Sequence, residues 1–228
     1  MSKNKLEILS NMAYFAKCKK YAIINILKFE APLTDEQGSL MNIFYNAYFT
    51  YWLGLIDYLT KEICFLTEQD VINLVDSEDN YYYLRNLRNA VVHRAEDFAN
   101  KGTVIKNMNI VVPFSPVNIT DQSGKKVYQP FYLNLIQIII KCEEINHICL
   151  NLIKQNDLIN YPDLTQDEFI NRHKGCPYIP YYVKTDEILE ESWKYYLKVK
   201  DEMKQVNVNR ILSYFETNYL FENVIEKI

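Results

Sequence analysis

Helical spacing of apolar residues runs through most of this chain and is rarely interrupted. The 228 residues include only five glycines and seven prolines, so few positions would break a helix. Apolar residues recur three or four positions apart, as at Leu6, Leu9 and Ala13, and again at Ile43 and Ala47. With 49% hydrophobic residues the chain can bury a core. The sequence therefore predicts an all-α fold.

The predicted fold is a bundle of four long helices, each with a recognisable start or end. Thr34 and Gln37 have the spacing of a capping box, and Ser77 precedes two acidic residues that suit a helix N-terminus. Ala31-Pro32 ends the first helix. We expect helices over about 3–29, 35–66, 78–95 and 131–155.

Two further segments are expected outside these four helices. Short β-prone runs surround an Asp-Gln-Ser-Gly turn at 121–124, so an insertion over about 102–130 is predicted to be a loop with a short β-hairpin. Beyond residue 156, Thr165 and Thr185 are expected to cap a short helix and one that ends near Val206. A final amphipathic helix is predicted at about 209–226. We therefore divide the chain into a bundle, 1–155, and a helical C-terminal extension, 156–228.

The cysteines and the N-terminus predict a cytoplasmic protein. Five cysteines with no CxxC pair do not suit a disulfide framework, and Cys142 and Cys149 are expected to be small buried hydrophobes. The N-terminus has no apolar signal region. One uncharged stretch, 37–56, contains two asparagines and three tyrosines, which favours a buried helix over a membrane span. No membrane partner is expected.

Charge is unevenly distributed along the chain. The net charge of −4 argues against a protein that coats nucleic acid through bulk electrostatics. Residues 81–106, however, hold five basic and two acidic side chains, which makes this segment +3 and the remainder −7. A solvated helix face is the ordinary explanation for such a run. The segment also contains the best functional clue in the sequence.

That clue is a cluster of arginine, asparagine and histidine on the third predicted helix. Histidine exchanges protons near neutral pH, and the guanidinium group of arginine matches a phosphate. Arg88 and His93 are five residues apart, which separates them by about 140° around an ideal helix. Asn89 shares the stripe of His93, as does Arg85, and the long Arg88 side chain could swing toward them. Such a stripe is costly to bury, so we expect it to line a cleft or an interface, although hydrogen bonding within the bundle is the alternative.

An arginine, a polar residue, three further residues and a histidine, placed on the third helix of an all-α bundle, resemble the motif of the HEPN superfamily. Arg88, Asn89 and His93 match the three motif positions, and the resemblance covers roughly residues 34–155. It implies a metal-independent endoribonuclease that acts as a homodimer without a cofactor, with the two motifs facing each other across one cleft. Many members are toxins or phage-defence nucleases, and an antitoxin partner is possible. Others have lost activity, so an inactive nucleotide-binding or protein-interaction module is the alternative.

In the active case His93 would act as general base or acid while the RNA 2′-hydroxyl attacks the adjacent phosphate. Arg88 would stabilise the charge on the phosphoryl oxygens, and Asn89 would position the phosphate or His93. The substrate-binding residues expected around them are Arg85, Arg94 and Tyr82.

Metal sites have weaker support in the sequence. His147 follows Glu143 and Glu144 at helical spacing, but a surface ion pair explains this equally well. His173 and Cys176 lack a second pair of ligands. We expect no metal site.

Overall fold

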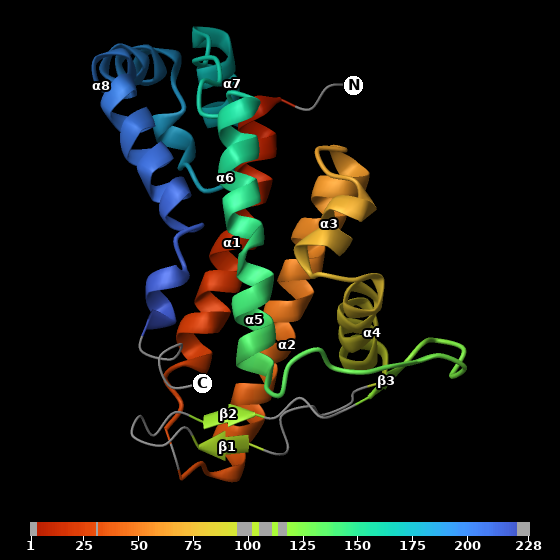
Figure 1. Cartoon of the computed structure of the whole chain (residues 1–228). Helices are drawn as coiled ribbons and strands as arrows, with labels where there is room; N and C mark the ends of the chain where they lie inside the picture. Colours follow the sequence, from red (N-terminus) through yellow and green to blue (C-terminus); the bar gives the residue numbers. More distant parts are fainter. Residues whose placement is uncertain (1–3, 31, 95–101, 105–110, 114–117, 223–228) are drawn as a thin grey trace.

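A computed structural model of the chain describes residues 4–30, 32–94, 102–104, 111–113 and 118–222. It is mostly helical with short antiparallel strand pairs, which confirms the predicted fold class (Figure 1). The helices are α1 (Lys5–Ile26), α2 (Asp35–Asp57), α3 (Glu68–Leu74), α4 (Glu78–Arg94), α5 (Leu135–Glu143), α6 (Ile145–Gln155), α7 (Gln166–Gly175) and α8 (Asp186–Ser213).

Helices α1 and α2 form an antiparallel pair at the centre of the molecule. Tyr14 meets Tyr51, and Tyr21 meets Phe44, so residue numbers rise along one helix as they fall along the other. The predicted capping box starts α2: the Thr34 hydroxyl accepts the Gln37 N–H, and the Gln37 side chain accepts the Thr34 N–H. Each bond satisfies a backbone group that the helix end would leave unpaired.

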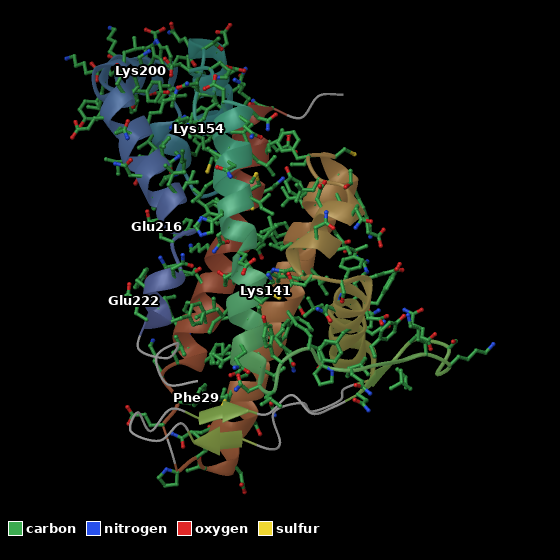
Figure 2. The ribbon with its side chains drawn as sticks, in the orientation of Figure 1. Phe29, Lys141, Lys154, Lys200, Glu216 and Glu222 are labelled. Carbon is green, nitrogen blue, oxygen red and sulfur yellow. The ribbon has the colours of Figure 1, made fainter. Side chains whose placement is uncertain are left out.

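The core lies between α1, α2, α4 and the α5–α6 pair, where side chains from these helices meet (Figure 2). Trp52 on α2 is fully buried, and its indole N–H donates to the Cys142 carbonyl at 2.8 Å. The C-terminal segment also joins this core, because Phe215 and Phe221 are buried in it. The core is therefore continuous from the predicted bundle into the predicted extension.

Several element boundaries differ from the prediction. Helix α2 gives way to a π-helical turn, Tyr58–Glu62, instead of running to Leu66, because the N–H groups of Phe65 and Leu66 both turn back to the Leu59 carbonyl. Helix α3, with its own Thr67 capping box, was not predicted. The predicted fourth helix is two helices with a break at Glu144.

The strand region and the C-terminus also differ. The insertion holds two strand pairs instead of one hairpin: β1 (Gly102–Val104) with β2 (Val111–Pro113), and β3 (Ile119–Thr120) with β4 (Val127–Tyr128). The predicted turn at 121–124 connects β3 and β4, and Gly124 adopts the positive φ of 69° that glycine allows. The prediction of a separate helix at 209–226 was wrong for residues 209–222, since α8 continues unbroken to Ser213 and a short 3-10 turn, Asn218–Leu220, follows. The rest of that predicted helix, 223–226, lies outside the described residues.

Candidate functional site

Helix α4 carries the arginine–histidine motif, as the sequence predicted. The Ser77 hydroxyl accepts the Asn80 N–H at 3.1 Å and so caps the start of the helix. Tyr83, Leu84 and Leu87 are buried in the core. Packing of this inner face fixes the rotation of α4 about its axis. The position of the polar motif on the helix is therefore fixed as well.

Arg85 forms an ion pair within the fold. Its Nη1 donates to Asp57 Oδ1 at 3.1 Å and to the Tyr81 hydroxyl at 2.9 Å. Burial disfavours the charged guanidinium, but the attraction of Tyr81 and Asp57 outweighs this, so the pKa of Arg85 is raised. Burial also opposes the charge of Asp57, yet hydrogen bonds and charge from Lys61 and Arg85 leave the pKa of Asp57 lowered. Arg85, predicted to bind substrate, thus already has a carboxylate partner.

Arg88 is half-buried and turns toward Asn89. Its Nη1 lies 3.3 Å from Asn89 Oδ1, which places the guanidinium beside the residue one helical turn before His93. Arg88 Nε is buried and has no hydrogen-bond partner within the described part of the chain. An unpaired buried N–H of a charged group is unfavourable and invites an acceptor. The backbone of α4 includes His93 and Arg94, whose side chains lie outside the described residues.

Tyr82 lies at the edge of the motif helix, between α3 and the β3–β4 hairpin. Its hydroxyl donates to Glu68 Oε1 at 3.5 Å, and its ring contacts Tyr128 with a centroid separation of 6.0 Å. The negative charge of Glu68 is the largest of the causes that raise the pKa of Tyr82. The ring is partly exposed, on the same helix as Arg88 but six residues earlier.

A buried polar cluster at the centre of the bundle was missed by the sequence reasoning. The Glu143 carboxylate accepts four hydrogen bonds, from Lys19 at 2.6 Å and from Tyr48, Asn146 and Thr217 at 2.8 Å each. Lys19 and Glu143 are only 1% and 2% exposed. Burial is the main reason that the pKa of Tyr48 is raised well above its ordinary value. Because every member is hydrogen-bonded, this cluster is a structural element of the core.

The weaker metal candidates do not assemble a site. Groups of three or more potential metal ligands are absent from the described residues. His147 is exposed, and His173 contacts the Phe169 carbonyl through Nδ1 at 2.8 Å. Cys142 and Cys149 are buried, as predicted, and desolvation raises the pKa of Cys149 to about 12. A thiol with such a pKa remains protonated near neutral pH.

Comparison of the chain with protein-family models, with curated proteins and with solved structures gives no match. Among the described residues, none of the helices combines the length and apolar character that a membrane crossing needs.

Proposed function

We propose that this chain is a HEPN-like, metal-independent endoribonuclease in which α4 carries the catalytic residues Arg88, Asn89 and His93. The observation that carries the proposal is the Arg88 side chain, which turns to Asn89 and has a buried Nε–H without a partner among the described residues. A phosphate oxygen would supply the missing acceptor, and a charge-assisted bond of this kind is stronger than a neutral one.

The proposed reaction needs only groups of the protein and of the RNA. His93 removes the proton of the 2′-hydroxyl, whose oxygen attacks the adjacent phosphorus. The bond from phosphorus to the 5′-oxygen breaks, and a proton passes to that leaving oxygen, leaving a 2′,3′-cyclic phosphate and a 5′-hydroxyl. Arg88 stabilises the charge that develops on the phosphoryl oxygens. In a homodimer the two His93 side chains divide the base and acid roles.

The test is cleavage of a long single-stranded RNA in EDTA by the wild type and by the Arg88→Ala and His93→Ala variants. Removing a general acid or base lowers the rate by about 10²–10⁴-fold, so we expect both variants to lose nearly all activity. His147→Ala is the matched control, because His147 is an exposed histidine on α6 and is outside the motif. Equal cleavage by all four proteins would reject the proposal.

Growth on expression provides a second readout, since the proposed biological role is in defence or in a toxin–antitoxin pair. We expect the wild type to arrest growth and Arg88→Ala to relieve the arrest.

The ion pair of Arg85 with Asp57 favours a second candidate function, an inactive binding module, because that arginine is already neutralised inside the fold. RNA binding without cleavage by the wild type, weakened in Arg88→Ala, would select this second candidate.

A further inference from the structure

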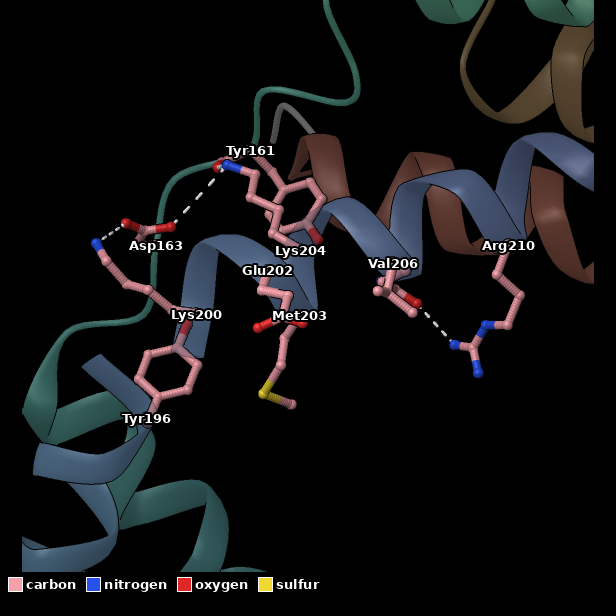
Figure 3. Close-up of a pocket in the computed structure, with 10 residues that line it drawn as sticks. Tyr161, Asp163, Tyr196, Lys200, Glu202, Met203, Lys204, Val206 and Arg210 are labelled. Carbon is pink, nitrogen blue, oxygen red and sulfur yellow. Dashed lines mark hydrogen bonds and ion pairs between the residues drawn. The ribbon is translucent and has the colours of Figure 1, made fainter. Parts of the chain in front are cut away.

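Three adjoining hollows follow α8, on a side of the molecule separate from α4, and two of them lie at its junction with α1. The first, of 460 Å³, lies beside α8 and the loop at Tyr161 (Figure 3). It shares Asn207 and Arg210 with a second hollow of 400 Å³. The second shares Lys17 and Tyr214 with a third hollow of 580 Å³ that reaches α2. We call the second and third hollows together the α1–α8 groove.

The α1–α8 groove is positively charged. Among the described residues that line it, Lys17, Lys20 and Arg210 are the charged ones, and no carboxylate is present. Lys20 donates to the Ser213 carbonyl at 2.7 Å, Lys17 lies 5.9 Å from the ring centre of Tyr214, and Arg210 donates to Asn207. None of the three forms an ion pair with a described carboxylate. In a protein of net charge −4, this concentrates positive charge in one groove.

Aromatic rings alternate with these cations along the groove. Tyr14 and Tyr21 on α1 are 55% and 63% exposed, and Tyr51 and Tyr214 lie beside them. The lining runs along α1 from Ser10 to Ile24, which is about 21 Å at 1.5 Å per residue. Flat rings beside cations suit stacked bases with phosphates between them.

From this arrangement we infer that the α1–α8 groove binds single-stranded nucleic acid. Phosphates lie on Lys17, Lys20 and Arg210, and unpaired bases stack on the exposed tyrosines. A duplex does not suit the groove, because its bases are already stacked on one another and cannot reach the rings. The inference does not depend on cleavage: α4 lies on the far side of α2 from α8 (Figure 1), so the groove is a site distinct from the arginine–histidine motif.

The experiment measures the fluorescence anisotropy of labelled twelve-nucleotide oligouridylate and oligothymidylate titrated with the full chain carrying His93→Ala, so that the RNA probe stays intact. We expect saturable binding of at least one probe. Three phosphate contacts give a slope of log K against log salt of about −2, at about −0.7 per contact on a single strand. Lys17→Ala or Arg210→Ala makes this slope shallower by about 0.7, and Tyr21→Ala weakens binding about five-fold or more.

Matched controls use exposed residues outside the groove, Lys198→Ala for the charge and Tyr178→Ala for the ring. Circular dichroism confirms that each variant folds. The inference is overturned if neither probe binds, if the controls weaken binding as much as the groove variants, or if duplex RNA or polyglutamate competes as well as the oligonucleotides. Binding of the RNA probe alone would support the inference and add recognition of the 2′-hydroxyl. If the probes bind but the unsubstituted chain does not cleave RNA, the proposed nuclease function is rejected and the inference about the α1–α8 groove stands.

Discussion

At the scale of single residues, Glu143 forms a buried ion pair with Lys19 at the centre of the bundle. Its carboxylate lies at the end of α5 and receives donors from α1, α2, α6 and the C-terminal segment, so one side chain connects four parts of the chain. The sequence contains one local sign of this buried polar cluster. Lys19 lies on the apolar stripe of α1 between Ala16 and Ile23, and a charge on such a stripe implies a buried partner. The identity of that partner, 124 residues away, could not follow from helical spacing.

Removing the charge of Lys19 tests this cluster. We expect Lys19→Met to destabilise the protein by about 3–5 kcal/mol, because Glu143 would lose its buried partner. Urea denaturation followed by circular dichroism gives the free energy of unfolding. Glu143→Gln should also be costly, and the double variant should cost less than the sum of the two single variants, since the charges are coupled. Additive costs would show that the pair is not coupled.

The candidate site was predictable at this scale only in part. The position of Arg88, Asn89 and His93 on one helix followed from the Ser77 cap and the apolar spacing, and α4 confirms it. The partner of Arg85 did not follow, because Asp57 belongs to a different helix and meets Arg85 only after α2 and α4 pack together. Local patterns determine which residues share a helix, whereas partners between helices depend on packing.

At the scale of elements, three capped helix starts were predicted correctly, whereas the ends of two long helices were not. Thr34, Thr165 and Thr185 each cap the helix that the sequence assigned to them, because a cap is a local hydrogen bond within four residues. The end of α2 depends instead on a π-helical turn, and α8 passes through Val206 without a break. Neither glycine nor proline marks these places, so the spacing of apolar residues alone could not locate them.

Two glycines within α2 give opposite predictions for the same substitution. A Cβ at Gly54 would lie 2.6 Å from Phe15 Cε1, so Gly54→Ala must displace the Phe15 ring and should destabilise the protein by about 1–3 kcal/mol. Gly38 has nothing within 4 Å of that position, so Gly38→Ala should stabilise the helix by about 0.5–1 kcal/mol. Thermal unfolding measures both. A gain of stability in Gly54→Ala would contradict the close packing of α1 on α2.

At the scale of the whole molecule, the C-terminal extension has two parts with different roles. Its last part returns to the bundle, where Phe221 is 1% exposed and Thr217 bonds to Glu143. Its first part forms a small cluster in which Phe169 contacts His173, Trp193 and Tyr196. Phe169 is buried but is not part of the main core. The sequence indicated that the bundle ends near residue 156. It could not show that the C-terminal residues return to the core of that bundle.

This division predicts two different responses to loss of a phenylalanine. Phe221→Ala removes part of the common core, should cost about 3–5 kcal/mol, and should speed amide hydrogen exchange in α1, α2 and α5 together. Phe169→Ala should speed exchange in α7 and the first half of α8 and leave α1 and α2 unchanged, because a small cluster can open without the core. Exchange followed by mass spectrometry compares the two variants with the wild type. Faster exchange of α1 and α2 in Phe169→Ala would mean that the extension and the bundle unfold as one unit. In that case α8 would transmit the loss of the Phe169 contacts from its first half to Ile211 and Phe215 in the core.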